Sequence, residues 1–360
     1  MWYNVFMKTV YVGMSGGVDS SVSALLLKEQ GYNVVGIYMK NWSKDLPGMR
    51  CPWAEDLADA KRVAVKLGID FEVWDFEKPY HDKVVDYMLE EFRNGNTPNP
   101  DIMCNQEIKF KLFYETAIKA GADYIATGHY ARSKVSTSNP LLMRAVDENK
   151  DQTYFLYRIS QEALAHTLFP IGEMKKPDVK RFAEEHGLHN AYKKESMGVC
   201  FVGEVGMKDF LKEYIDIEPG EIREIETEHV LGYHEGAIFY TIGQRHGLFL
   251  SGEKGVINDG MPYYVVKKDL EKNIIYVSKN LNHEAIWSKE LKLRDVFMRG
   301  GGVTKAPFEM QVRLRHRAPL VPARYSDGIL HFETEIKRPA SGHSAVFYDG
   351  EVCLGGGIIK

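Results

Sequence analysis

A run of small and acidic residues near the start of the chain has the composition of a phosphate-binding loop. Residues Gly13–Ser20 read GMSGGVDS and lie between a predicted strand, Thr9–Gly13, and a predicted helix, Ser20–Gln30. Backbone N–H groups at such a strand-to-helix turn favour an anion, and glycines let it approach closely. The loop is neither a Walker A sequence nor a GxGxxG turn. We therefore expect phosphate binding by Gly13, Met14, Ser15, Gly16, Gly17, Val18, Asp19 and Ser20, with the carboxylate of Asp19 acting through Mg²⁺.

Two cysteines lie in sequence contexts that suit a reactive thiol. Cys104 lies in NPDIMCN (Asn99–Asn105) and Cys200 in SMGVCFVG (Ser196–Gly203). Their distance in the sequence excludes a CxxC redox pair or a zinc pair. The Asn-Pro-Asp run before Cys104 is typical of a turn that holds polar side chains in the open, and Asp101 is near enough to transfer or steer a proton. A reactive thiol needs an electropositive, partly exposed site, which a pocket for phosphate and magnesium would provide.

The elements that position these residues alternate in the first third of the chain. Strand, helix, strand and helix predict a doubly wound parallel sheet with helices on both faces. The expected strands are Val34–Met39, Phe71–Asp75 and Tyr124–Thr127. The expected helices are Ala54–Leu67, Val84–Phe92, Ile108–Ala120, Val179–His186 and Met207–Tyr214.

From about Pro219 the pattern changes to short β-rich runs punctuated by glycine. These runs are Ala237–Ile242, Tyr263–Lys267, Ile274–Val277, Glu309–Arg315, Leu330–Ile336 and Ser344–Tyr348. They predict two small β-rich or β-barrel domains. We expect a nucleotide-binding and catalytic domain at 1–215, a central β-rich domain at 216–284 and a C-terminal β-barrel at 285–360.

Length and composition are those of an ordinary soluble globular protein. The chain has 360 residues, which suits two or three domains, with 44% hydrophobic and 27% charged residues. We find no apolar run near the ~18 residues of a membrane span and no basic segment of a signal peptide. Four cysteines are too few for a disulfide scaffold and favour a reducing, cytoplasmic location. We expect Cys51 and Cys353 to be small buried core residues.

Charge is distributed unevenly along the chain. The net charge is −4, yet residues 285–360 carry 12 Lys and Arg against 8 Asp and Glu. Arg313, Arg315 and Arg317 alternate within QVRLRHR. On a strand they would share one face and form a phosphate-binding stripe, so we expect this region to contact RNA.

SGGVDS (Ser15–Ser20) resembles the PP-loop pyrophosphatase signature, whose members activate a carbonyl or carboxylate by adenylation with ATP. It is joined, in order, by NPDIMCN, ATGHYAR, KDQTYFL, VCFVGE and SAVFYDGEVCLGGG. With these motifs the chain resembles the bacterial tRNA-specific 2-thiouridylases from about Met7 to Gly357. Two alternatives remain, a PP-loop ligase of small molecules and a non-catalytic nucleotide- or RNA-binding module. The two placed cysteines and the basic C-terminal region favour the sulfurtransferase.

The resemblance implies a reaction and roles for its residues. ATP would adenylate the C2 oxygen of the wobble uridine in tRNAs for Lys, Glu and Gln, with Met39 and Gly128 as further ATP contacts. A persulfide on Cys200 would deliver the sulfur, and Cys104 would attack or resolve it, leaving a disulfide. Asp101 would be the general acid/base. The sulfur would come from a donor protein, either a cysteine desulfurase or a sulfur-relay protein.

The same resemblance implies the RNA contacts. The target base would be held by Asn99, Pro100 and Asp101, while His129 and the KDQ residues would lie along the RNA; these are Lys150, Asp151 and Gln152. Arg315 and His316 match an Arg-Tyr contact pair of the family, with His in place of Tyr. His343 stands where the family usually has Gln.

Overall fold

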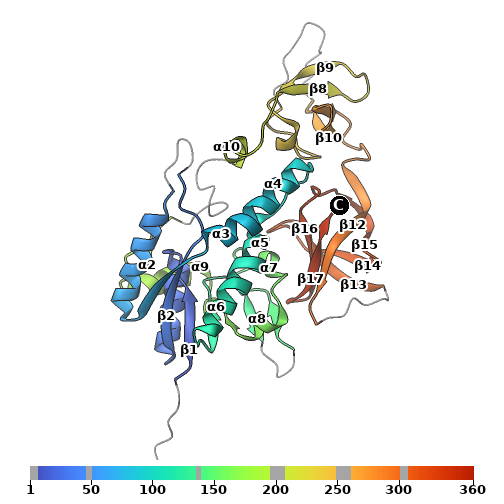
Figure 1. The fold of residues 1–360 in the computed structure, drawn as a ribbon. Coiled ribbons are helices and arrows are strands. Elements are labelled where there is room, and N and C mark those ends of the chain that lie inside the picture. The colour runs from blue at the N-terminus through green and yellow to red at the C-terminus, as the bar shows by residue number, and fades with distance from the viewer. Residues whose placement is uncertain (1–6, 46–50, 135–138, 195–206, 249–260, 301–306) are drawn as a thin grey trace, which may run out of the picture.

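The computed structural model describes residues 7–45, 51–134, 139–194, 207–248, 261–300 and 307–360. These form an α/β unit, a small β-sheet unit and a β-barrel (Figure 1). Cys200 and the VCFVGE segment lie outside the described residues. Within the described residues, no helix combines the length and the apolar character that crossing a bilayer requires.

A parallel sheet of five strands forms the centre of the α/β unit, in the order β3-β2-β1-β4-β7. Its strands are β1 (Thr9–Gly13), β2 (Asn33–Lys40), β3 (Asp70–Asp75), β4 (Tyr124–Ala126) and β7 (Thr167–Leu168). All of its pairings are parallel, because each strand returns through a helical connection. The predicted doubly wound sheet is confirmed, although the two-residue strand β7 has too little sequence pattern to be predicted.

Side chains alternate between the two faces of this sheet, and helices cover both. Val10 and Val12 of β1 pack with α1 (Val18–Glu29), α2 (Trp53–Leu67) and α9 (Lys176–Glu185). Tyr11, between them, packs in the second cluster with the helices of residues 77–119. Period-two alternation in a strand buried on both sides explains why TVYVG carries no polar face.

Two helical runs on the second face contain π-helical segments. The first comprises α3 (Glu77–Tyr80), η1 (His81–Val85) and α4 (Asp86–Arg93). The second comprises α5 (Pro100–Met103), η2 (Cys104–Leu112) and α6 (Phe113–Lys119). Both predicted helices exist, but each begins seven or eight residues earlier than expected. The π-helical hydrogen bond joins residues five apart and is frequent at functional sites.

The rest of the α/β unit connects it to the barrel. It contains β5 (Arg132–Lys134), β6 (Leu141–Met143), α7 (Thr153–Leu156), α8 (Gln161–Ala165) and α10 (Met207–Lys212). The β5–β6 hairpin extends the barrel sheet, because Leu142 and Met143 pair with Cys353 and Val352. The first and last units therefore share one hydrogen-bonded sheet.

The central unit is a four-stranded sheet in the order β10-β11-β8-β9. Its elements are β8 (Gly220–Glu224), β9 (Val230–His234), η3 (Ala237–Phe239), β10 (Tyr264–Asp269) and β11 (Ile274–Ser278). The predicted strand at Ala237–Ile242 is wrong. Turn-type bonds from Phe239 to Gly236 and from Tyr240 to Ala237 form a 3₁₀ helix there, and Ala237 joins the core of this sheet.

Six antiparallel strands form the C-terminal barrel, in the order β12-β15-β14-β13-β16-β17. They are β12 (Trp287–Met298), β13 (Phe308–Arg313), β14 (Val321–Ser326), β15 (Ile329–Lys337), β16 (Ser344–Asp349) and β17 (Val352–Ile359). Pairing of β12 with β17 closes the barrel, which leaves no free edge between these six strands. Val312, Leu330 and Phe347 fill its interior. The predicted β-barrel is confirmed.

Candidate functional site

The loop between β1 and α1 has the form of an anion cradle. Gly17 is the residue before α1, and no side chain caps the first turn of that 12-residue helix. The Ser20 and Ser21 hydroxyls donate to the carbonyl of Gly17 at 3.1 and 2.9 Å, which fixes the turn. The N–H groups of Ser15 and Gly17 are bonded to the hydroxyls of Ser20 and Ser15, so a ligand would meet the N–H groups of the uncapped first turn of α1, at the positive end of the helix dipole.

A cavity of about 260 Å³ opens over this loop and collects most of the predicted ATP residues. Those on its wall are Gly13, Met14, Ser15, Asp19, Ser20, Met39 and Gly128. Two predicted RNA contacts, His129 and Gln152, line the same cavity, as does Lys109. Val18 is instead buried in the core. One cavity therefore joins a phosphate cradle to residues expected at the RNA.

Gly16 and Gly128 are glycines for reasons of backbone packing. Gly16 has φ +78°, and a Cβ there would lie 2.3 Å from the carbonyl oxygen of Asp56. A Cβ on Gly128 would lie 2.6 Å from the backbone nitrogen of Ser20. Gly128 thus lets the end of β4 touch the start of α1, in addition to lining the cavity.

Replacing Gly128 with alanine is expected to weaken ATP binding by tenfold or more, about 1.4 kcal/mol. The new methyl group must push the first turn of α1 away and misalign the cradle. The measurement is the ATP dissociation constant by calorimetry. Gly350→Ala is the control, because Gly350 lies in an exposed turn with no atom within 4 Å of its would-be Cβ. Equal ATP affinity in the two variants would contradict the packing argument.

Asp19, the predicted magnesium ligand, is bonded to a lysine and a tyrosine in the structure. Both of its carboxylate oxygens accept hydrogen bonds from Lys176 Nζ at 2.7 Å, and the Tyr130 hydroxyl donates to Oδ1 at 2.9 Å. The ammonium of Lys176 competes with a divalent cation for this carboxylate. Asp19 holds Lys176, at the start of α9, against the base of α1, and we derive no step through Mg²⁺.

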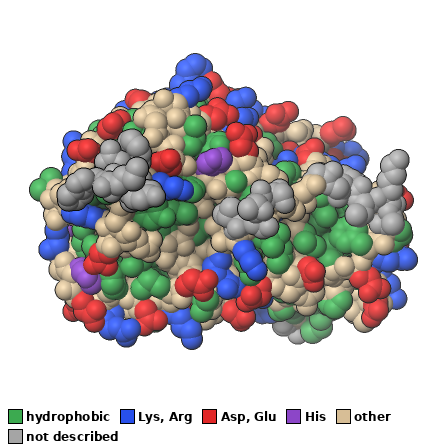
Figure 2. All heavy atoms as spheres, turned by 90° about the horizontal axis from the view of Figure 1, so that it is seen from below, with side chains coloured by type: hydrophobic (Ala, Val, Ile, Leu, Met, Phe, Trp, Pro, Cys, Tyr) green, Lys and Arg blue, Asp and Glu red, His purple; other side chains and the backbone are tan. Residues whose placement is uncertain are grey.

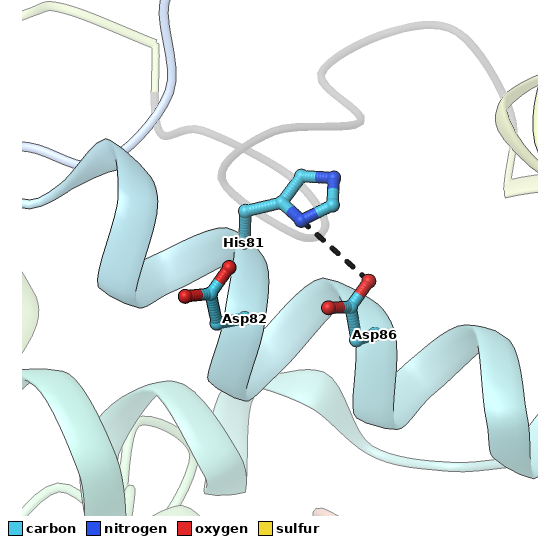
Figure 3. Close-up of side chains that lie close together, drawn as sticks. All are labelled: His81, Asp82 and Asp86. Carbon is cyan, nitrogen blue, oxygen red and sulfur yellow. Dashed lines mark ion pairs between the residues drawn. The ribbon is translucent and has the colours of Figure 1, made fainter.

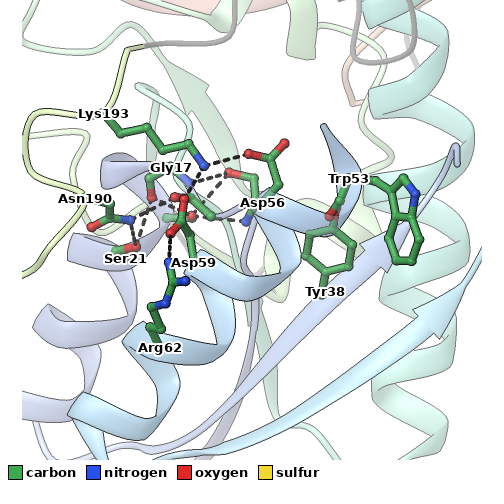
Figure 4. A network of polar contacts seen from close by, with 12 residues as sticks. Gly17, Ser21, Tyr38, Trp53, Asp56, Asp59, Arg62, Asn190 and Lys193 are labelled. Atoms are coloured by element: carbon green, nitrogen blue, oxygen red, sulfur yellow. Dashed lines mark hydrogen bonds and ion pairs between the residues drawn. The ribbon is translucent and has the colours of Figure 1, made fainter. Parts of the chain in front are cut away.

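A second network fastens the loop from the other side (Figure 4). The Asn190 amide donates to the Gly16 carbonyl and to the Ser21 hydroxyl, both at 2.9 Å. Lys193 bridges Asp56 and Asp59 of α2 at 2.7 and 2.5 Å. Residues 190–193 therefore hold the phosphate loop against α2, although no sequence pattern marked them.

The segment around Cys104 differs from the expected open turn. The chain is helical from Pro100 onward, and Cys104 is buried, only 2% exposed, as the first residue of η2. The Asn105 amide donates to the Phe155 carbonyl at 3.1 Å, so this polar side chain faces inward. A proline at the first helical position is compatible with helix, which is why NPD begins a helix here.

The pKa values of Asp101 and His129 are both shifted, and Lys109 contributes to both shifts. Desolvation raises the pKa of the Asp101 carboxyl, and the nearby charge of Lys109 lowers it in part. Desolvation holds the pKa of His129 well below its usual range, and Lys109 lowers it further. His129 is therefore neutral near pH 7, with its Nδ1 2.9 Å from the Thr127 hydroxyl. A carboxyl with a raised pKa in a partly enclosed site suits proton transfer.

The other described cysteines divide into two environments. Cys353 is fully buried in the barrel wall, and burial raises the pKa of its thiol to about 12. This agrees with its expected structural role. Cys51 is also buried, but it lines the nucleotide cavity beside Pro52 and Trp53, which the sequence did not indicate.

Among the described residues, three side chains offer a possible metal site elsewhere, His81, Asp82 and Asp86 (Figure 3). His81 Nδ1 lies 3.5 Å from Asp86, and Asp82 accepts a hydrogen bond from Lys78 at 2.7 Å. Both acids are exposed. These contacts describe a surface ion-pair cluster on η1 and α4 rather than a built metal site.

The KDQ residues have three different roles. Asp151 is buried and bonds Arg313 of the barrel at 2.7 Å and the Thr153 hydroxyl at 2.9 Å. Gln152 Oε1 accepts a hydrogen bond from the Tyr130 backbone at 2.8 Å and lines the cavity. Lys150 is half-buried. The carboxylate of Asp151 therefore fastens the α/β unit to the barrel and does not face RNA in this conformation.

The predicted arginine stripe is wrong. Strand β13 ends at Arg313, whose side chain is buried in the ion pair with Asp151. The chain then turns, with Arg317 at φ +64°, so only Arg315 and Arg317 are exposed. Figure 2 shows basic and acidic side chains interspersed on the face seen from below, without a broad patch of one charge.

His316 and His343 flank Arg315 and are partly enclosed. The His316 ring lies 4.5 Å from that of Phe155, and its Nδ1 finds no hydrogen-bond partner among the described residues. Desolvation lowers the pKa of His316 to about 4 and also lowers that of His343. Both rings are neutral near pH 7 and can stack on a base or accept a hydrogen bond.

We expect His316 to lower the free energy of unfolding as the pH falls. Its pKa is about 4 when folded and about 6.5 when exposed, so the unfolded chain gains a proton first as the pH falls. The contribution of the neutral ring is complete above pH ~6.5 and is lost progressively toward pH ~4. His316→Tyr should therefore gain thermal stability relative to the unmodified protein between about pH 7.5 and about pH 5. A difference in melting temperature that is constant with pH would contradict this.

Three family models match consecutive parts of the chain. They are described as a tRNA methyl transferase HUP domain at 8–204, a tRNA methyl transferase PRC-barrel domain at 208–279 and an aminomethyltransferase beta-barrel domain at 288–359. The first spans the α/β unit, and the others span the two β units.

Curated relatives resemble the chain over nearly its whole length. The tRNA-specific 2-thiouridylase MnmA of Idiomarina loihiensis is 48% identical, covering 98% of this chain and 96% of the relative. Proteins of the same name from Listeria welshimeri and Pseudomonas syringae are 47% and 46% identical, covering 97% and 99% of this chain and 94% and 95% of theirs. A solved 4-thiouridine synthetase bound to RNA and ATP aligns with 51% of this chain and 42% of its own, at 16% identity and a TM-score of 0.35, which is too distant to inform function.

Proposed function

The chain belongs to the family of tRNA-specific 2-thiouridylases, and from this premise we propose that it converts the wobble uridine of tRNAs for Lys, Glu and Gln to 2-thiouridine. The observation that carries the proposal is the shared cavity. Its wall contains the phosphate cradle on one side and His129, Gln152 and Lys109 on the other. A nucleotide and a base can therefore meet in a single enclosed place.

The first step activates the uracil. Its C2 oxygen attacks the α-phosphorus of ATP, the bond from that phosphorus to the bridging oxygen breaks, and pyrophosphate leaves with the electron pair. The N3 proton is lost to a base as the O-adenylate forms. Asp101 suits this role, because desolvation raises its pKa while the carboxyl stays partly accessible. The step replaces a poor leaving group, a carbonyl oxygen, with a good one, AMP.

The second step transfers sulfur. A donor protein, either a cysteine desulfurase or a sulfur-relay protein, first leaves a persulfide on Cys200. The terminal sulfur attacks C2, the C2–O bond breaks and AMP departs, which gives a Cys200–S–S–C2 linkage. The Cys104 thiolate then attacks Cys200 Sγ, and the S–S bond to the base breaks. The products are 2-thiouridine and a Cys104–Cys200 disulfide, which cellular thiols reduce with two electrons.

Burial of Cys104 constrains this step. At 2% exposure Cys104 is screened from solvent, and it is not among the residues that line the cavity. A disulfide to Cys200 requires the two Cα atoms to come within about 4.4–6.8 Å. We propose that binding of the base at Asn99, Pro100 and Asp101 accompanies this approach.

RNA would lie along the mouth of the cavity and the adjacent barrel end. Arg315 is exposed and supplies a phosphate contact, while the neutral rings of His316 and His343 are placed beside it. His129, Gln152 and Lys150 extend this path toward the cavity. The wobble base must leave its stack to enter, which is less costly in an anticodon loop than in a duplex.

The direct test is nucleoside mass spectrometry of tRNA after incubation with the protein, ATP, Mg²⁺ and a persulfide source. We expect sulfur in place of one oxygen at the wobble uridine, dependent on ATP. The mass change also separates thiolation from methylation, to which the family-model descriptions refer. Unmodified uridine throughout, with ATP bound, would contradict the proposal and favour a PP-loop ligase of small molecules.

A further inference from the structure

Lys109, on the wall of the nucleotide cavity, is a candidate for a role in the reaction that neither the sequence motifs nor the family assignment gives it. The charged residues among those described on the cavity wall are Asp19, Asp56 and Lys109. Asp19 is held by Lys176, and Asp56 by Lys193. Lys109 is the one Lys or Arg among the described residues of this wall, which it shares with the phosphate loop.

The position of Lys109 follows from the unusual helix that carries it. It lies in η2, whose π-helical hydrogen bonds join residues five apart. Lys109 is five residues after Cys104, so it lies one turn further along the same side of the helix. An α-helix, with 3.6 residues per turn, would rotate the two side chains well apart.

Electrostatics place the Lys109 charge close to the groups expected to handle the base. The charge of Lys109 lowers the pKa of both Asp101 and His129. These two residues come from different elements, the start of α5 and the loop after β4. Lys109 and His129 line the cavity together with residues of the phosphate loop, whereas Asp101 is not on its wall.

We propose that Lys109 is a catalytic residue whose ammonium contacts the α-phosphate of ATP while the uracil oxygen attacks it. As oxygen attacks phosphorus and pyrophosphate leaves, negative charge spreads over the non-bridging oxygens of that phosphate. A fixed cation in an enclosed cavity stabilises this charge more than it stabilises bound ATP. A lysine suits the role, because a compact ammonium interacts with phosphate as a point charge.

The same cation serves the following step without moving. The α-phosphate remains attached to the uracil oxygen in the adenylate and departs as AMP. Lys109 therefore stays near the leaving group while sulfur attacks C2.

The test compares Lys109→Ala with Lys111→Ala. Lys111 lies two residues along the same helix, with its side chain 56% exposed and bonded to Glu107 at 2.9 Å, so it controls for helix composition and loss of one charge. This inference rests on the proposed function, so the unmodified protein must first produce 2-thiouridine. The readouts are ATP affinity, tRNA-dependent pyrophosphate release in a single turnover, and the pH dependence of that rate.

For Lys109→Ala we expect pyrophosphate release to slow by about 10²–10³-fold, with a much smaller loss of ATP affinity. The acidic limb of its pH profile should move to higher pH, because the pKa of Asp101 rises when the Lys109 charge is removed. Lys109→Arg should recover part of the rate, and Lys111→Ala should behave like the unmodified protein. Equal rates for both alanine variants, or an unmoved acidic limb, would overturn the assignment. Absence of thiolation in the unmodified protein would instead refute the proposed function.

Discussion

Cys200→Ser is expected to abolish 2-thiouridine formation while leaving ATP binding and tRNA-dependent pyrophosphate release intact. A serine hydroxyl cannot carry the sulfane sulfur, so the adenylated uracil has no sulfur nucleophile to meet. We expect thiolation to fall by at least about 10³-fold, because nothing else in the reaction replaces a covalent carrier. The measurements are nucleoside mass spectrometry and a pyrophosphate assay on the same reaction.

Cys104→Ser separates the role of the second thiol. If Cys104 resolves the Cys200–S–S–C2 linkage, this variant should accumulate tRNA bound to the protein through a bond that a thiol reductant breaks. Cys353→Ala is the matched control, because Cys353 is buried in the barrel and has no part in the reaction. Full thiolation by Cys200→Ser would contradict the assignment, and so would loss of thiolation by Cys353→Ala in a folded protein.

Asp151→Ala is expected to lower the free energy of unfolding by about 3–5 kcal/mol, as removal of one partner of a buried ion pair does. The Asp151 side chain is fully buried and that of Arg313 is 6% exposed. Without Asp151, the charge of Arg313 would stay buried, with Tyr348 beneath it. The measurement is the unfolding midpoint in urea.

The double variant Asp151→Ala/Arg313→Ala should lose less stability than the sum of the single variants, since the buried charge of Arg313 is removed together with its partner. Arg144, 3.8 Å from Asp151, loses this contact both in the double variant and in Asp151→Ala. Glu148→Ala is the matched control, because it breaks a surface pair with Arg144 at 3.3 Å and should cost less than about 1 kcal/mol. Strictly additive single effects would contradict the buried-pair argument. Because the pair joins the KDQ loop to the barrel, we also expect the single variants to weaken tRNA binding.

Hydrophobic patterns within short segments correctly predicted the first strands and helices of the α/β unit. Strand β1 and helix α1 follow from buried apolar patterns that end at Gly13 and Gly31, and strand β2 follows from the apolar run Val34–Met39. The same reasoning failed at Ala237–Ile242, whose apolar run packs as a 3₁₀ turn against a sheet formed by distant strands. It also failed at QVRLRHR, where β13 ends at Arg313 because that side chain pairs with a residue 162 positions away.

The sequence indicated the site residues that form the phosphate loop with their own backbone. It did not indicate the residues that contact this loop from distant parts of the chain. The phosphate loop was identified from its glycines and its place between strand and helix. Lys176, Asn190 and Lys193 were missed, because their contacts with that loop and α2 span well over 100 residues. Lys109 gave no signal, because only a π-helical turn aligns it with Cys104, and residue types do not predict such a turn.

In the proposed reaction, ATP activates the uracil C2 oxygen inside this cavity before sulfur replaces it. The most direct measurement uses tRNA whose wobble uridine carries oxygen-18 at C2, with unlabelled ATP and a persulfide source in a single turnover. We expect AMP recovered with the 2-thiouridine product to contain the label in its phosphate. Unlabelled AMP, with the label released to water while 2-thiouridine forms, would contradict it.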